Sequence, residues 1–338
     1  MRCWLAFGLP WAVVAAMPGK APAWNSVGHL AVSKLAYDQM DDGVKVRLFA
    51  ILKSHPHYST FLAAGKPPEV EEAEWVILRA SIWSDWIRPR DKDPRPDITK
   101  YHRGEEHYVN IPFIDPKDAD AFAGKTLINP DFTDILCSLK QRCNELRLRT
   151  ASAEDRAVAA CWIFHLIGDI HQPLHSVAYF SSNKAFEYGD QGGNKFGIKA
   201  NGRGWKLHAF WDDVLAEDAN YTDDSPERQA KIYRQAITVA TNLRALKLSN
   251  ADKEKLSKNR SFESWSRESF ELAKTVAYQK ADGSGLIEGV EVKFNQPVPD
   301  NAPEVGEKYV ERAKATAEVR VVMAGQRLAD RIKALLPK

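Results

Sequence analysis

The segment that most constrains this chain is residues 157–180, AVAACWIFHLIGDIHQPLHSVAYF, which is apolar enough for a core helix yet carries many polar groups. A helix that is hydrophobic on every side is buried, so its polar side chains lose contact with water when the chain folds. Eleven consecutive positions contain His165, Asp169, His171 and His175. His165 and Asp169 are four residues apart and therefore lie on one helix face. Pro173 is expected to end the helix, so that His175 turns toward a separate position.

Helical periodicity runs through most of the remaining chain. Apolar residues recur every three or four positions in residues 25–40, 71–87, 151–170, 226–246, 261–278 and 304–336. Ser152 and Ser225 stand at expected helix starts, the second followed by Pro226. Only residues 192–210 favour extended structure, with a turn at Asn201-Gly202. The sequence predicts an all-α fold, a single mainly helical domain over residues 24–338 with a small β-hairpin near 192–208.

The first 23 residues, MRCWLAFGLPWAVVAAMPGKAPA, have the features of a secretory signal peptide. Arg2 precedes an apolar run, and small residues at the end of the segment resemble a cleavage site. We expect cleavage between Ala23 and Trp24, and a mature protein that is secreted or periplasmic. The run is too short to cross a membrane comfortably, and no later stretch approaches the ~18 apolar residues of a membrane span. A buried N-terminal helix or a membrane anchor is the alternative.

The charge balance limits how this protein can bind nucleic acid. The chain has 47 basic and 45 acidic residues, and Arg2 and Lys20 belong to the predicted signal peptide. The mature chain is therefore nearly neutral, which excludes binding through a basic surface alone and requires a local site. On a helix, Cys137 and Cys143 would lie about 9 Å apart along the axis, beyond disulfide reach. With Cys161 as the third cysteine and no CxxC motif, we expect neither a disulfide framework nor a thiolate zinc site.

A second histidine–aspartate pair repeats the spacing of the first. His208 and Asp212 in LHAFWDD are also four residues apart. Imidazole nitrogen and carboxylate oxygen are the ligands that zinc accepts where thiolate is absent. One buried histidine is most often a hydrogen-bonded core residue, but two such pairs in apolar and aromatic sequence favour metal binding. Further candidates are Asp85 in RASIWSDWIR, His107 in EEHYVNIPF, His29 in WNSVGHLAV, and the α-amino group and carbonyl oxygen of Trp24 after cleavage.

In this order and context, these residues resemble those of the zinc-dependent, single-strand-specific nucleases of fungi and plants (the nuclease S-one/P-one family) and their bacterial relatives. The resemblance covers nearly all of the mature chain, and FHLIGDIHQPLH with a downstream HAFWD is its most specific part. The signal sequence and short loops favour a bacterial member. The resemblance implies an α-helical fold shared with zinc phospholipases C, and three Zn²⁺ ions at the bottom of a cleft.

The resemblance also assigns the ligands of the three zinc ions. One ion would be bound by Asp85, His107 and His165, with Asp169 bridging to the second. The second would be bound by the Trp24 amine and carbonyl, His29 and Asp169. The third would be bound by His175, His208 and Asp212.

Such a centre would hydrolyse phosphodiesters. A hydroxide held between two zinc ions could attack phosphorus, and the third ion would stabilise the departing 3′ oxygen. Arg88 is expected to bind the non-bridging phosphate oxygens, and Asp85 to accept a proton from the attacking water. The implied substrates are single-stranded DNA and RNA, cut to 5′-nucleotides, and 3′-nucleotides, which would lose their phosphate. We expect a monomer without a membrane span.

The resemblance also suggests how a base is bound. Tyr108 matches a base-stacking aromatic residue, Asn110 a position that hydrogen-bonds the base in some members, and Phe180 could close the other side. A surface ion pair for Arg88 and simple core packing for Tyr108 are the alternatives. His171 matches no ligand. We expect His55, His57 and His102 to be surface or loop residues.

Two other functions remain open from the sequence. A zinc phospholipase C would have the same fold and nearly the same metal ligands, but that family has glutamate at the position of Asp212. A secreted protein that binds zinc or nucleic acid without catalysis is the other alternative, although binding alone does not require a bridged pair of metal ions.

Overall fold

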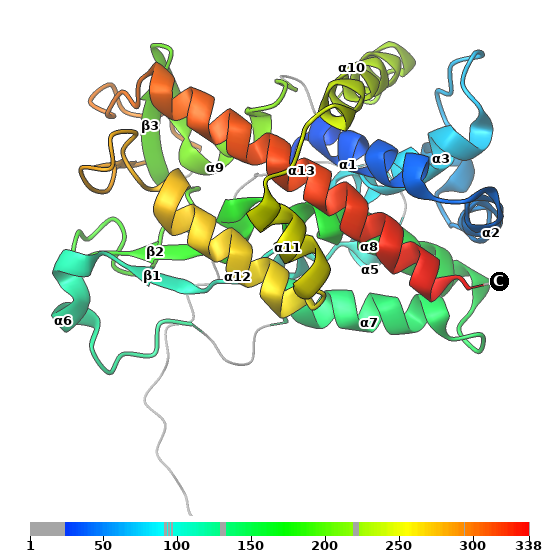
Figure 1. The fold of residues 1–338 in the computed structure, drawn as a ribbon, viewed down its shortest axis with the longest axis horizontal. Coiled ribbons are helices and arrows are strands. Elements are labelled where there is room, and N and C mark those ends of the chain that lie inside the picture. The colour runs from blue at the N-terminus through cyan, green and yellow to red at the C-terminus, as the bar shows by residue number, and fades with distance from the viewer. Residues whose placement is uncertain are drawn as a thin grey trace, which may run out of the picture.

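The computed structural model describes residues 24–337 except residues 91, 92, 94, 96, 129–132, 219–222 and 294. The predicted signal peptide, residues 1–23, lies outside the described residues. The fold is mainly helical, as predicted, and its short strands gather at one end, on the left of Figure 1. Among the described residues, no helix combines the length and the hydropathy needed to span a bilayer.

Helix α8, Ala153–Asp169, lies at the centre of the molecule. Ser152 caps its start, since the Ser152 hydroxyl accepts a hydrogen bond from the N–H of Asp155. Every residue from Ala157 to Asp169 is buried. The helices packed around it are α1 (Ser26–Gln39), α2 (Asp42–Leu52), α3 (Glu72–Ala80), α4 (Trp83–Trp86), α7 (Ile135–Arg147) and α13 (Glu307–Leu335). A helix that is apolar on all sides needs this cover, and the polar groups at its C-terminal end are buried with it.

Helix α13 crosses the molecule in front of α1 and α8 in Figure 1. It packs closely on α1 because position 325 is glycine: a Cβ there would lie 2.6 Å from the Cβ of Leu35. Helix α10 (Pro226–Arg244) packs against α1 and starts as predicted, with Ser225 as its cap and Pro226 in its first turn. The remaining helices are α5 (Ile98–Tyr101), α6 (Ala119–Phe122), α9 (Leu207–Asp213), α11 (Asn250–Lys258) and α12 (Phe262–Leu272).

Two of the predicted helical segments differ in detail from the structure. Residues 71–87 form α3 and α4, separated at Ser81 and Ile82, rather than one continuous helix. Residues 261–278 form α12 followed by a π-helical turn, Ala273–Ala277. A second π-helical turn, Tyr58–Leu62, and short 3₁₀ turns at Gly104–His107, Pro116–Asp118 and Pro173–Ser176 connect other elements. The helices without a counterpart among the predicted helical segments are α2, α5, α6, α7, α9 and α11.

The predicted hairpin is present as β3 (Phe196–Ala200) and β4 (Arg203–Lys206). Ala200 pairs with Arg203, so Asn201 and Gly202 form a two-residue turn, and both have positive φ as a type I′ turn requires. Strand β5 (Val290–Glu291) extends this sheet antiparallel to β3. A second pair, which the sequence did not predict, joins β1 (Pro112–Ile114) and β2 (Ala178–Phe180) in parallel.

Two large groups of buried apolar residues form the interior. The first lies among α1, α2, α3, α7, α8, α10 and α13, and the second lies around the hairpin, α9, α12 and the start of α13. The chain passes from one to the other directly after α8, since Ile170 belongs to the first group and Leu174 to the second. The polar residues singled out in the sequence lie at this junction.

Candidate metal centre

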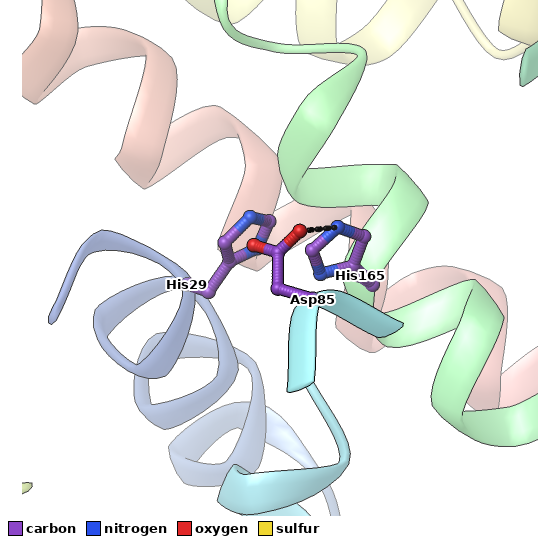
Figure 2. Close-up of side chains that lie close together, drawn as sticks. All are labelled: His29, Asp85 and His165. Atoms are coloured by element: carbon purple, nitrogen blue, oxygen red, sulfur yellow. Dashed lines mark ion pairs between the residues drawn. The ribbon is translucent and has the colours of Figure 1, made fainter. Parts of the chain in front are cut away.

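Eight of the nine predicted metal ligands meet in three buried groups. In each group, the possible ligand atoms lie within 4.8 Å of one another. The groups are His29, Asp85 and His165; His107, His165 and Asp169; and His175, His208 and Asp212. Figure 2 shows the first, with His29 from α1, Asp85 from α4 and His165 from α8 pointing toward a common centre. Because His165 belongs to two groups, the first two form one continuous cluster.

The carboxylate of Asp169 is the hub of this cluster. Its Oδ2 lies 2.9 Å from Nδ1 of His107 and 3.2 Å from Nε2 of His165, and its Oδ1 lies 3.2 Å from Nε2 of His29. Burial alone would raise the pKa of Asp169, but the charge on His165 and the hydrogen bonds of the surrounding imidazoles hold it well below its usual range. An ionised carboxylate with both oxygens facing imidazoles can bridge two cations.

The ring of His165 is fixed by the break between α3 and α4. Its Nδ1–H donates a hydrogen bond of 2.7 Å to the carbonyl oxygen of Ser81, at that break. The opposite nitrogen, Nε2, then faces Nδ1 of His107 at 3.0 Å and Oδ1 of Asp85 at 3.7 Å. The interruption of the predicted helix 71–87 thus has a function in the structure: it presents Ser81 to His165 and turns Asp85 toward the cluster.

The third group contains two imidazoles that repel each other unless a cation lies between them. Nδ1–H of His175 donates to the carbonyl oxygen of His107 at 2.7 Å, and Nδ1–H of His208 donates to that of Gly192 at 2.6 Å. Their Nε2 atoms, 3.1 Å apart, therefore both present lone pairs when the rings are neutral. Burial and the neighbouring His175 lower the pKa of His208 to about 3, which favours the neutral ring.

Asp212 completes this group, and its pKa is also shifted toward the neutral form. Its Oδ2 lies 3.7 Å from Nε2 of His208, and its Oδ1 accepts a hydrogen bond of 2.8 Å from Gln172. Burial raises the pKa of Asp212 well above its usual range, and the charges of Asp213, Asp85 and Asp169 add to this shift. A bound metal ion would supply a compensating positive charge.

The residues present fit a divalent metal ion. Among the described residues, the buried ligand atoms that lack a well-formed hydrogen bond include His29 Nε2, Asp169 Oδ1 and Asp212 Oδ2. Buried polar atoms are nearly always satisfied, so a set of unsatisfied atoms that face common points indicates a missing partner. Nitrogen and carboxylate oxygen donors are the set that zinc accepts.

The main chain at Trp24 lies beside both ligand clusters. The Trp24 indole is fully buried, and its Nε1–H donates to the carbonyl oxygen of Gly168, next to Asp169. The N–H of the following residue, Asn25, donates to the carbonyl oxygen of Asp212 at 3.2 Å. The Asn25 side chain in turn caps α1 by accepting from the N–H of Gly28. Metal binding by the Trp24 amine stays a prediction, and this is the location that it requires.

Three glycines that were not among the predicted site residues allow other atoms of the site to pack closely against the backbone. A Cβ on Gly168 would lie 2.6 Å from Nδ1 of His29. A Cβ on Gly192 would lie 2.5 Å from the carbonyl oxygen of Leu174, and one on Gly193 would lie 3.0 Å from the backbone nitrogen of His208. The signal was present, since glycine inside the apolar helix and in GDQGGN indicates close approach of other atoms.

Arg88 and Asp85 face a cavity beside the ligand clusters. Nη2 of Arg88 lies 2.8 Å from Oδ1 of Asp85, and both residues line a cavity of about 390 Å³ together with Asp212. Burial raises the pKa of Asp85, but the charges of Arg88 and the nearby histidines outweigh it and the net shift is downward. The carboxylate is therefore ionised and the guanidinium is directed at the ligand cluster, rather than at a distant surface partner.

The three predicted base-contacting residues lie in different surroundings. Tyr108, which directly follows His107, is half-buried, and burial raises its pKa to about 12. Asn110 is also half-buried. Phe180 is only 3% exposed and packs against Phe122 in a small separate apolar group. A ring so deeply packed offers little surface to a base, and none of the three lines the cavity beside Asp85.

His171 has a structural role. Its Nδ1–H donates to the carbonyl oxygen of Ile167, and its Nε2 accepts from Nη1 of Arg327 at 2.9 Å. Arg327 and Arg320 both pair with Glu268. Burial and these two arginines hold the pKa of His171 well below its usual range. The neutral ring joins α8 to α13 and is turned away from the ligands.

His55, His57 and His102 are loop residues, as expected, but two of them are not at the surface. His55 and His57 are buried. Nε1–H of Trp83 donates to Nδ1 of His57, and the N–H of His57 donates to Nδ1 of His55. The rings pack against the aromatic side chains of this region, whose burial the surrounding polar sequence does not reveal.

Comparison with known proteins agrees with this geometry. The chain is similar to Endonuclease 2 of Arabidopsis thaliana, with 26% identity over 224 residues, which is 63% of this chain and 60% of the relative. It is similar to Endonuclease 4 of the same plant, with 25% identity over 65% of this chain and 63% of the relative. It is also similar to Nuclease S1 of Aspergillus oryzae, with 28% identity over 36% of this chain and 40% of the relative.

These alignments span less than two thirds of the length of each curated relative. The family model described as S1/P1 Nuclease, in contrast, matches residues 24–337, which is nearly the whole described chain and includes every residue of the three ligand groups. By this match, the chain belongs to the S1/P1 nuclease family.

Proposed function

We propose that this protein is a zinc-dependent phosphodiesterase that hydrolyses single-stranded DNA and RNA to 5′-nucleotides and removes phosphate from 3′-nucleotides. The observation that carries the proposal is the arrangement of three buried histidine–aspartate groups, two of which share His165 and are bridged by Asp169. Membership of the S1/P1 nuclease family supports a nucleic acid as the substrate.

The residues that would hold three Zn²⁺ ions are Trp24, His29, Asp85, His107, His165, Asp169, His175, His208 and Asp212. When bound, zinc would lower the pKa of water toward neutrality and neutralise charge on phosphate and leaving-group oxygens. The orientation of the imidazoles is set by backbone carbonyls, namely Ser81 for His165, His107 for His175 and Gly192 for His208. Such partners fix the ring and leave the other nitrogen unprotonated and directed at the metal.

Asp85 and Arg88 act directly on the substrate in this proposal. The low pKa of Asp85 keeps its carboxylate ionised, so that it can bind metal and accept a proton from the attacking water. The guanidinium of Arg88, 2.8 Å from that carboxylate, is placed to bind the non-bridging oxygens of the same phosphate. Asp85, Arg88 and the predicted ligand Asp212 line the same cavity.

Tyr108 would stack on the base at the 3′-hydroxyl side of the scissile phosphate. Tyr108 directly follows His107 in the chain, which places it next to a predicted metal ligand. Stacking on a base requires only one accessible face of its ring. Asn110 would hydrogen-bond the base edge, and Phe180 would close the other side of the base. In this structure the Phe180 ring is only 3% exposed.

We also propose that the protein is secreted or periplasmic and works as a monomer, with signal-peptide cleavage between Ala23 and Trp24. The hydrogen bonds from Trp24 to Gly168 and from Asn25 to Asp212 support this cleavage site, because they hold the main chain at Trp24 beside the ligand clusters. The family match also begins at Trp24.

The direct test uses the mature protein with single-stranded DNA, 3′-nucleotides and phosphatidylcholine vesicles as substrates. We expect hydrolysis of the first two, loss of both with EDTA, recovery with Zn²⁺, and close to three zinc ions per chain by elemental analysis. Turnover of the lipid without turnover of nucleic acid would instead identify a phospholipase C.

The variant Asp85→Asn tests the chemistry. We expect its kcat/KM on single-stranded DNA to fall by roughly 10²- to 10⁴-fold, because proton transfer and a metal ligand are both impaired. Asp120→Asn, an exposed aspartate in α6, is the matched control and retains full activity. Full activity in the Asp85 variant, with normal zinc content, would reject the mechanism.

The N-terminal ligand is tested by a protein that keeps Pro22-Ala23 before Trp24. Its amide nitrogen replaces the amine, so we expect the loss of about one zinc ion and a large fall in activity. The same dipeptide added after Lys338 is the control. Unchanged zinc content and activity in the N-terminal extension would show that Trp24 is not a ligand.

A further inference from the structure

The cavity beside the ligand clusters reaches the β3–β4 hairpin. Asp85, Arg88 and Asp212 line one end, and Arg203 and Trp205 of β4 line another part of its wall. Its volume of about 390 Å³ is in the range that holds small organic ligands. The cavity is thus larger than a phosphate needs, and its further part has no role in the function proposed above.

The hairpin presents a flat platform to this cavity. The guanidinium of Arg203 lies over the indole of Trp205, 3.9 Å from the ring centroid. Trp205 is half-buried, and its ring rests edge-on against Phe210, which fixes its position. Arginine planes and indole rings are the two surfaces on which unstacked bases pack in single-strand-binding proteins. Trp205 is also only three residues from the ligand His208, so platform and metal centre move together.

Charged side chains of both signs line the cavity. Its wall includes four arginines, at positions 88, 90, 203 and 228. Apart from the ligands Asp85 and Asp212, the facing acids are Asp213, Asp218 and Asp224. Asp218 pairs with Arg228, Asp224 pairs with Arg90 at 2.9 Å, and Asp213 accepts a hydrogen bond from Asn25. The lining thus holds four arginines and five aspartates, so the cavity attracts a phosphate only once metal ions neutralise the ligands Asp85 and Asp212.

We propose that this cavity binds the nucleotide on the 5′-phosphate side of the cut, with its base stacked on the Trp205–Arg203 platform. Tyr108 does not line the cavity, so the two aromatic residues would bind bases on opposite sides of the scissile phosphate. The substrate would then be bound through one base on each side of the phosphodiester bond that is hydrolysed. Stacking on the platform favours a base that is separated from its complement. The inference rests on the proposed nuclease function.

The experiment compares wild type with Trp205→Ala and Trp205→Phe. The substrates are an oligothymidylate, whose chain continues on both sides of the cut, and 3′-thymidine monophosphate, which has no nucleotide on the 5′-phosphate side. We expect Trp205→Ala to lower the ratio of kcat/KM for oligonucleotide over mononucleotide by roughly 5- to 100-fold, the effect of losing one stacked base. Trp205→Phe, which keeps a smaller ring, restores part of the ratio. Inhibition by the 5′-mononucleotide product weakens in the same order.

The matched control is Tyr188→Ala, which removes an aromatic ring that is 84% exposed and does not line the cavity. Binding of a phosphorothioate oligothymidylate to the EDTA-treated protein gives a second readout without catalysis, and Trp205→Ala weakens it. An unchanged ratio and unchanged binding would overturn the proposal. An equal loss on both substrates would also overturn it, since Trp205 would then only support the fold around His208. If wild type does not cut single-stranded DNA at all, the proposed function itself fails.

Discussion

A methyl group at position 168 would lie 2.6 Å from Nδ1 of His29 and 2.8 Å from its Cε1, so the imidazole of His29 depends on the absence of a side chain in α8. The variant Gly168→Ala must push that ring away from Asp169. We expect the zinc content to fall by about one ion and the activity on single-stranded DNA to fall at least tenfold. Elemental analysis and steady-state kinetics measure both.

The stability of this variant changes less than its activity. Overpacking costs about 1–3 kcal/mol, and alanine regains about 1 kcal/mol of helix propensity over glycine. Gly43→Ala in α2 is the matched control, because there the nearest atoms are the ends of the flexible Arg47 and Asp41 side chains. Normal zinc content in Gly168→Ala would contradict the role given to His29.

Single residues also mark how far the sequence could predict the site. His165 and Asp169 follow from their spacing on an apolar helix, as do His208 and Asp212. Asp85 and His107 have no such spacing; their apolar and aromatic surroundings made them candidates, and their assignment as ligands came from the resemblance to a family. His171 looks the same as His165 in sequence, and only Arg327, 156 positions away, distinguishes the two. A contact between segments so far apart cannot be predicted from the local sequence around either residue.

At the scale of elements, a buried ion network ties α12 to α13. The carboxylate of Glu268 pairs with Arg320 and Arg327, whose side chains are almost fully buried. Burial raises the pKa of Glu268, but the hydrogen bond and the charges of the two arginines lower it to about 2. The folded-state pKa is therefore below that of the unfolded chain, so the pair stabilises the fold above about pH 4.5, and this contribution is lost as pH falls toward 2.

The variant Glu268→Gln tests this network. It leaves two buried guanidiniums without their carboxylate, and we expect a loss of about 3–5 kcal/mol in the free energy of unfolding at pH 7. The stability difference between the variant and wild type shrinks as pH falls from 4.5 to 2. Urea denaturation at several pH values measures both. Glu271→Gln, an exposed glutamate on the same helix, is the control. A pH-independent difference would contradict the low pKa of Glu268.

Elements also show where sequence patterns fail. Helix α11 has no buried residue, so it lacks the apolar stripe by which helices are found. The parallel pair of β1 and β2 joins segments 66 positions apart, as Pro112 with Ala178 shows. At the break, the carbonyl oxygen of Ser81 accepts a hydrogen bond from His165. This tertiary contact outweighs the helical periodicity of residues 71–87.

At the scale of the whole molecule, the ligand clusters lie at the junction of two apolar cores. Removal of the metal ions leaves the Nε2 atoms of His175 and His208 facing each other at 3.1 Å and Asp212 uncompensated. We expect EDTA to lower the Tm by roughly 10 °C, because each ion present at 100 times its Kd adds about 2.7 kcal/mol. Scanning calorimetry with and without added Zn²⁺ measures the change. Recovery with Ca²⁺, which prefers all-oxygen sites, would contradict the nitrogen-rich ligand set.

The ligands are spread along the chain from His29 to Asp212, and none of the three groups is complete within one segment. A ribosome or an export channel releases the chain in order, so Asp169 emerges long before the segment that carries His208. The two groups that share His165 can therefore form before residues 208–212 have been synthesised. The third group can form only after residue 212. Under the proposed zinc binding, the ions load only late in the synthesis and folding of each molecule, so the concentration of free metal where folding ends would decide how many molecules become active.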